Sequence, residues 1–170
     1  MAIYNILNES DSLLREKAKA IPKINSGVIR LLDNLRDTLR ETGRGVGLSA
    51  PQIGVSKRAF IIDVAQEDIY YEMINPELSG MKGRGEAWEG CLSVDGVEGL
   101  IPRADKLRVR YTDRDWRDHE LEAEGYIARI IQHEYDHLEG VIFRDRALSI
   151  RDAEHKPAEG DKAEGDREEG

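Results

Sequence analysis

The run His133-Glu134-Tyr135-Asp136-His137 constrains this chain more than any other feature. It lies in residues 125–138, whose pattern predicts a helix. Residues four apart lie on one face of a helix, so the two imidazoles can hold a single metal ion. Glu134 lies about 100° around the helix from His133, beside such an ion, where a general base for water belongs. The motif therefore favours a catalytic metal site over two unrelated surface histidines.

Two histidines do not complete such a site, because a catalytic metal normally has three protein ligands and an open position. One familiar continuation of the motif requires a histidine where this chain has Phe143. Glu154 and His155 lie in the C-terminal tail, and His119 follows a turn-like segment. Cys91 remains as the third candidate, since it is the one cysteine and has small or polar neighbours. A thiolate ligand favours iron, zinc, nickel or cobalt over magnesium or calcium.

The length and the apolar patterns predict one α+β domain. The chain has 170 residues, of which 39% are hydrophobic, enough for a single core. Apolar residues at three- and four-residue spacings predict another helix over 26–42. The fold class is therefore α+β, with antiparallel β-sheets packed around the central helix that carries the two histidines. Strands are expected over 58–64, 70–74, 106–112 and 120–123, and loops over 43–47, 80–85 and 113–118.

The C-terminal part differs from the rest in composition. Residues 1–150 are predicted to form the single catalytic domain, and residues 151–170 an acidic tail. The tail holds eight acids and four bases and almost no apolar residues. It cannot bury enough surface to offset its ordering entropy, so it is expected to be mobile.

Charge and hydropathy exclude several classes of partner. The net charge is −9, which does not resemble the basic surface of a nucleic-acid-binding protein, so no direct nucleic acid binding is expected. There is no apolar run of the roughly 20 residues that a membrane-spanning helix needs. The N-terminus lacks the pattern of a signal peptide. We therefore expect no membrane association and a cytoplasmic location.

A glycine-rich segment precedes these motifs. It reads Gly45-Val46-Gly47-Leu48-Ser49-Ala50-Pro51-Gln52. Glycines allow a backbone to approach a ligand closely, although most such segments are only turns. Gln52 offers an amide donor without a titratable proton, which suits stabilisation of an oxyanion. The segment is not a phosphate-binding P-loop, because no Gly-Lys-Ser/Thr follows it.

Three segments in this order resemble peptide deformylase: Gly-Val-Gly-Leu-Ser-Ala-Pro-Gln at 45–52, Glu-Gly-Cys-Leu-Ser at 89–93 and Gln-His-Glu-Tyr-Asp-His at 132–137. The similarity includes Ile101-Pro102-Arg103. The resemblance implies antiparallel sheets around the motif helix. It also implies removal of the formyl group from the N-terminal formylmethionine of new polypeptides, giving formate. The native metal would be Fe(II), with Zn(II), Ni(II) or Co(II) also able to bind.

The resemblance also assigns roles at the reacting centre. Glu134 would take a proton from water and later pass one to the departing amine. The Gln52 amide and the Leu92 backbone N–H would stabilise the oxyanion that forms on the formyl oxygen. The metal ligands would be Cys91, His133 and His137.

Contacts to the substrate follow from the same resemblance. Tyr126, Arg129 and Ile130 lie on the histidine stripe of the helix and would line the pocket for the methionine side chain. Arg129 is expected to lay its methylenes along the wall with its guanidinium in solvent. The alternative is that its charge contacts the peptide or Glu89. The remaining substrate-binding residues would be Val46, Gly47, Gly90 and Arg103.

Two other functions use the same motif. A zinc peptidase would cleave an internal amide but needs a third histidine or glutamate ligand. A non-catalytic metal-binding module needs a closed four-ligand site, for which no fourth ligand is evident. The partner of a peptide deformylase would be the N-formylmethionyl nascent peptide. In some members of that family a basic C-terminal helix docks on the ribosome; an acidic tail would be repelled by ribosomal RNA, which argues against that docking mode.

Overall fold

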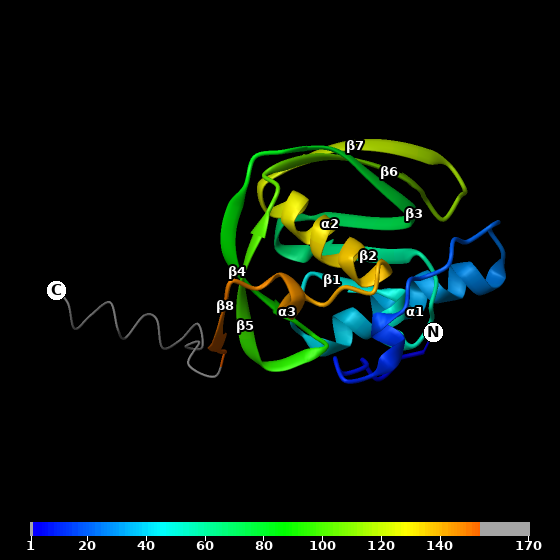
Figure 1. Ribbon diagram of the computed structural model, residues 1–170. Helices are drawn as coiled ribbons and strands as arrows, with labels where there is room; N and C mark the ends of the chain where they lie inside the picture. Colours follow the sequence, from blue (N-terminus) through cyan, green and yellow to red (C-terminus); the bar gives the residue numbers. More distant parts are fainter. Residues whose placement is uncertain (1, 154–170) are drawn as a thin grey trace.

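The computed structural model describes residues 2–153, which form two antiparallel sheets around helix α2 (Figure 1). The larger sheet has the strand order β1-β2-β3-β6-β7, and the smaller one has the order β4-β5-β8. No helix in residues 2–153 is both long enough and apolar enough to cross a membrane. The elements are η1 (Ser12–Arg15), α1 (Ser26–Thr42), β1 (Gly47–Ser49), η2 (Ala50–Ile53), β2 (Ala59–Val64), η3 (Ala65–Glu67), β3 (Ile69–Lys82), β4 (Gly85–Cys91), β5 (Val94–Arg103), β6 (Lys106–Thr112), β7 (Asp118–Glu124), α2 (Gly125–Leu138), α3 (Phe143–Arg146) and β8 (Ser149–Asp152).

Helix α1 has the bounds that its sequence predicts. The Asn25 side chain accepts a hydrogen bond from the Val28 N–H, which satisfies one free donor of the first turn. Gly43 ends the helix in the left-handed conformation, at φ 64°. The apolar stripe of the helix is buried, and its members are Val28, Leu31, Leu32, Leu35 and Leu39.

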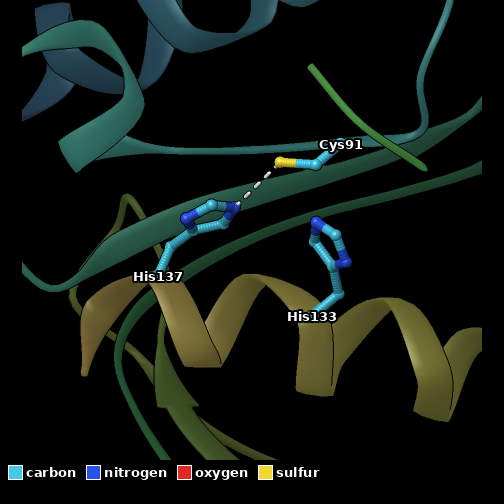
Figure 2. Close-up of side chains that lie close together, drawn as sticks. All are labelled: Cys91, His133 and His137. Atoms are coloured by element: carbon cyan, nitrogen blue, oxygen red, sulfur yellow. Dashed lines mark hydrogen bonds between the residues drawn. The ribbon is translucent and has the colours of Figure 1, made fainter. Parts of the chain in front are cut away.

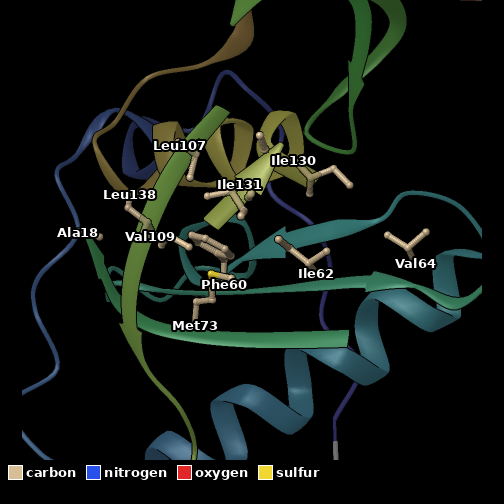
Figure 3. Close-up of a cluster of buried hydrophobic side chains, with 12 residues drawn as sticks. Ala18, Phe60, Ile62, Val64, Met73, Leu107, Val109, Ile130, Ile131 and Leu138 are labelled. Carbon is tan, nitrogen blue, oxygen red and sulfur yellow. The ribbon is translucent and has the colours of Figure 1, made fainter. Parts of the chain in front are cut away.

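Strand β2 is buried on both faces and joins the two main parts of the core. Phe60 and Ile62 belong to the cluster that includes α2, shown in Figure 3. Ala59 and Ile61 belong to the cluster that includes α1. Because side chains alternate along a strand, the larger sheet is packed on opposite faces by the two helices.

Helix α2 packs one side against the larger sheet. Its other side is free to carry the two histidines of the candidate metal site. Ile131 and Leu138 are fully buried in the cluster with β2, β3, β6 and β7. His133 and His137 lie about 100–160° around the helix from these positions, on the side toward β4. The helix also has the predicted bounds, so the two histidines keep the spacing that a shared ligand requires.

The loop predicted over 80–85 is wrong except for residues 83 and 84. Strand β3 continues to Lys82, and β4 begins at Gly85. The pairing of β3 with β6 shifts register between Ser79 and Lys82, and Gly80 lies there with φ 58°. Gly80 therefore marks a β-bulge, which a sequence pattern does not distinguish from a loop. The glycine-rich segment likewise becomes strand β1 from Gly47 onward, because it pairs with β2.

The boundary predicted between residues 150 and 151 falls inside strand β8. Ile150, Arg151 and Asp152 pair with Gly99, Glu98 and Val97 of β5. Strand pairing with a distant segment overrides the polar local composition. The rest of the predicted tail, including Glu154 and His155, lies outside the described residues.

This boundary predicts different results for two truncations. A chain ending at Ala153 should unfold at the same denaturant concentration as the full chain, because all contacts of β8 are kept. A chain ending at Ser149 loses three of the four paired residues of β8. Its free energy of unfolding should fall by about 1–3 kcal/mol. Equal midpoints for both truncations in urea would show that β8 does not contribute to stability.

Candidate metal centre

Three side chains with metal-binding atoms meet between helix α2 and the end of β4 (Figure 2). His133 and His137 project from one side of α2, and Cys91 is the last residue of β4. Their candidate ligand atoms all lie within 4.8 Å of one another, and the Cys91 Sγ is 3.4 Å from the His137 Nε2. The helix supplies the i, i+4 pair, and the antiparallel hairpin β4–β5 brings in the thiol from a distant part of the chain.

The donor atoms of this cluster suit a divalent cation. The Nδ1 of His133 donates to the ionised Glu89 Oε1 at 2.9 Å, which directs Nε2 toward the cluster. Burial by itself raises the pKa of the Cys91 thiol, but His137 and His133 outweigh burial and hold that pKa well below its usual value. A thiolate and neutral imidazoles are the forms that bind metals. The donor set therefore fits iron, zinc, nickel or cobalt.

Glu89 holds His133 in place through a buried ionic network, of which the sequence predicts only the contact with Arg129, as an alternative. Its carboxylate accepts from Arg103 at 2.7 and 2.9 Å and from Arg129 at 2.6 Å. Burial by itself raises the pKa of Glu89, but His133 and Arg103 outweigh it and lower that pKa to about 2. In the sequence, the one indication of this role is that the acidic residue Glu89 directly precedes Gly90 and Cys91. Glu89 stays ionised and orients the imidazole of a candidate ligand.

Glu134 lies beside the cluster and is nearly free of partners. It is 3% exposed, and its Oε2 has no hydrogen-bond partner in residues 2–153. Its Oε1 lies 3.9 Å from the His133 Nε2. Burial raises the pKa of this carboxyl, while His133 and His137 partly oppose that effect. A buried carboxyl with an unused oxygen is suited to accept a proton from water.

Gly47 is required next to Glu134 for a steric reason. A Cβ at this position would lie 3.0 Å from the Cγ and from the Oε1 of Glu134. Such a contact is closer than ordinary packing allows, so a side chain here would displace the carboxylate. The glycine-rich segment therefore has a packing role at the site in addition to forming strand β1.

The Gln52 amide is held in one orientation. Its Oε1 accepts hydrogen bonds from the Ser49 N–H and hydroxyl, each at 2.9 Å. Its Nε2 therefore faces the other way, 3.1 Å from Ser93 Oγ and 3.7 Å from Cys91 Sγ. This network fixes the amide as a donor directed at the cluster, as oxyanion stabilisation requires.

A cavity of about 580 Å³ opens onto the cluster. Of the residues predicted to contact substrate, all but one line it. The exception is Arg103, which is 5% exposed and absent from the lining formed by the described residues. A peptide contact by Arg103 stays a prediction, and in the structure its guanidinium pairs with Glu89 and Asp136. The predicted residues that line the cavity are Val46, Gly47, Gln52, Gly90, Cys91, Leu92, Tyr126, Arg129, Ile130, His133 and Glu134.

Arg129 does not point its guanidinium into solvent. Besides Glu89, it donates to the carbonyl oxygens of Ile101 at 3.0 Å and Gly85 at 2.8 Å. The alternative expectation, contact with Glu89, is the one that the structure has. Arg129 thus ties α2 to both strands of the β4–β5 hairpin.

Because of these contacts, Arg129 is expected to stabilise the fold as well as line the cavity. Arg129→Leu should lower the free energy of unfolding by about 1–3 kcal/mol, because charged hydrogen bonds are lost and two carbonyls lose a partner. Urea unfolding measures this loss. A solvated arginine would give no measurable change, and that result would contradict the network. Arg117→Leu, at an exposed turn position, is a suitable control.

A helix that carries His-Glu-x-x-His, a thiol from a neighbouring strand and a buried free carboxylate together define a metal-dependent hydrolase. The family model for polypeptide deformylase matches residues 3–153. The chain belongs to the polypeptide deformylase family.

Individual relatives agree with this assignment. The peptide deformylase of Pelotomaculum thermopropionicum is 46% identical over 151 residues, covering 89% of this chain and 96% of the relative. The crystal structure of the Thermotoga maritima peptide deformylase has a TM-score of 0.83 at 35% identity and covers 88% of this chain and 100% of that one. The crystal structure of the Thermus thermophilus peptide deformylase has a TM-score of 0.81 at 39% identity and covers 98% of this chain and 95% of that one. The α+β fold around the central helix is thereby confirmed, and the zinc peptidase alternative is not favoured.

Proposed function

We propose that this chain hydrolyses the N-formyl group of formylmethionine at the start of newly made polypeptides and releases formate. One divalent metal ion would be held by Cys91, His133 and His137. The observation that carries the proposal is the cluster of these three residues with the free oxygen of Glu134 beside it. When bound, such a cation supplies Lewis-acid chemistry, polarising a carbonyl and lowering the pKa of water.

The protein groups then account for the proton transfers. Glu134 takes a proton from the attacking water while the new C–O bond forms at the formyl carbon. The charge that develops on the formyl oxygen receives hydrogen bonds from the Gln52 amide and the Leu92 backbone N–H. Glu134 next gives the proton to the amine nitrogen as the C–N bond breaks. The products are formate and a peptide with a free N-terminal amine.

The cavity lining supports the binding of an extended peptide. Gly47 of β1 and Gly90 of β4 both line the cavity, so a peptide could pair with their backbone groups as an added strand does. Tyr126 and Ile130 offer aromatic and branched surface against which a thioether packs well. The proposed substrate is therefore the N-formylmethionyl nascent peptide, which places the enzyme in the cytoplasm where such peptides are made. We do not propose docking on ribosomal RNA through the acidic tail.

The test is a comparison of two reactions on one substrate. The metallated protein is given a formyl-Met tripeptide, and formate and new internal N-termini are measured separately. Formate release without internal cleavage is expected. Internal cleavage without formate would refute the proposal and favour a peptidase.

We further propose Fe(II) as the native metal, with Zn(II), Ni(II) or Co(II) able to replace it. An oxidisable metal beside a thiolate predicts progressive loss of activity in air. The nickel form should keep its activity several times longer than the iron form under the same aerobic conditions. Equal half-lives would count against iron-linked damage, and anaerobic incubation of both forms is the control.

A further inference from the structure

The cavity extends past the metal cluster onto the smaller sheet. This outer part is lined by Trp88 of β4, Val97 and Glu98 of β5, and Ala153, which follows β8. The Ala153 N–H donates to the Gly96 carbonyl at 3.0 Å, which fixes the end of β8 at the cavity. The C-terminal strand therefore borders the same space as the candidate metal ligands, far from them in sequence.

One side chain of β8 contacts two of these lining residues. The Arg151 guanidinium lies over the Trp88 ring, 4.1 Å from its centroid. The same guanidinium is 3.2 Å from the Glu98 carboxylate. Arg151 itself is not among the described residues that line the cavity. It thus contacts wall residues on two different strands without facing the cavity.

The strand pairing explains why these three side chains meet. Arg151 pairs with Glu98 across β5 and β8, and Trp88 pairs with Leu100 across β4 and β5. Leu100 is two residues from Glu98, so all four side chains belong to one face of the smaller sheet. On one face of a sheet, an aromatic or long side chain can contact the residue paired with it and the residues diagonal to it on the neighbouring strand.

These contacts orient the side chains more than they stabilise the fold. The Arg151 side chain is 50% exposed, and exposed ion pairs and cation–π contacts contribute little to stability. Glu98 is 13% exposed and already paired with Arg151, so it offers no free charge to a ligand. Trp88 and Ala153 instead give the outer cavity apolar surface.

We infer that Trp88 forms a subsite for an apolar or aromatic side chain of the peptide downstream of formylmethionine, and that Arg151 is a positioning residue that holds this ring. The inference rests on the proposed function and adds a specificity to it. A large flat ring favours stacking with aromatic side chains, and a ring held in one orientation loses less entropy on binding. The C-terminal strand is in this way part of the peptide-binding site.

The test measures kcat and KM on formyl-Met tripeptides that carry alanine or phenylalanine at the second or third position. Wild-type protein should show a lower KM for a phenylalanine peptide than for the alanine peptide. Trp88→Ala should raise the KM of the phenylalanine peptide roughly 2- to 10-fold, with little change in kcat. Arg151→Gln should give part of this rise, and Arg151→Lys, which keeps a cation, should restore most of the preference.

A matched control and a spectroscopic signal separate positioning from general damage. Arg108 also lies on a strand in a cross-strand ion pair and is 48% exposed, so Arg108→Gln should leave the preference unchanged. In a Trp116→Phe background the remaining tryptophan is Trp88. Its emission should shift in Arg151→Gln and return in Arg151→Lys.

Two results would overturn the inference while leaving the proposed function intact. One is an unchanged phenylalanine preference in Trp88→Ala. The other is an equal loss for all peptides in Arg151→Gln, accompanied by a lower unfolding temperature, which would assign Arg151 to strand stability alone. Absence of formate release from every peptide would instead refute the proposed function.

Discussion

Cys91→Ala is expected to remove the metal from the protein and abolish formate release. The side chains of His133 and His137 would remain, but two imidazoles give too few ligands for a tight catalytic site. The thiolate is the one anionic atom of the cluster, so its loss also removes the main electrostatic attraction for a cation. Metal content per chain and formate release, measured on the same sample, test this expectation.

The variant must be shown to fold before its activity is interpreted. Wild-type and variant proteins, both freed of metal, should unfold at similar temperatures, because Cys91 is only partly buried and alanine fits its place. Ser93→Ala alters a neighbour of the same segment without touching a candidate ligand and should keep the metal. Full metal occupancy and activity in Cys91→Ala would show that the third ligand has been assigned wrongly.

Glu134→Gln should keep both the fold and the metal while turnover falls by about 10²–10⁴-fold. Glutamine has nearly the same shape as glutamate, so it fits the space against Gly47. It cannot accept the proton of water, and it removes a buried carboxylate whose pKa is already raised by burial. Metal content, unfolding temperature and kcat are the three measurements.

Another glutamate of the same chain provides the control. Glu139 follows α2 and pairs with Arg58 and Lys17. Glu139→Gln should therefore keep turnover close to wild type. A metal-free Glu134→Gln protein would contradict the expectation, since it would make Glu134 a ligand instead of a base.

The parts of the structure that the sequence predicts are those governed by local rules. The bounds of α1, β6 and α2 follow from apolar periodicity and, for α1, from its caps. The histidine pair could be predicted because its spacing on a helix is itself local. Cys91 could be placed near the pair only by excluding other ligands and by resemblance.

The parts that the sequence does not predict depend on partners far along the chain. Strand β8 forms because β5 offers it an edge, although its own composition is polar. The buried carboxylate partners of Arg103, Glu89 and Asp136, lie 14 and 33 residues away in the chain. The partners of Arg129 lie between 28 and 44 residues away in the chain. No local pattern encodes such contacts.

One metal ion at Cys91, His133 and His137 is expected to be what makes this chain active as a deformylase. The direct measurement is a titration of metal-free protein with Fe(II), without oxygen, in which formate release from a formyl-Met tripeptide is followed at each addition. Activity should start near zero, rise in proportion to the metal added and level off at about one ion per chain, as a single three-ligand site requires. Full formate release from the metal-free protein, or none at saturating metal, would contradict the claim.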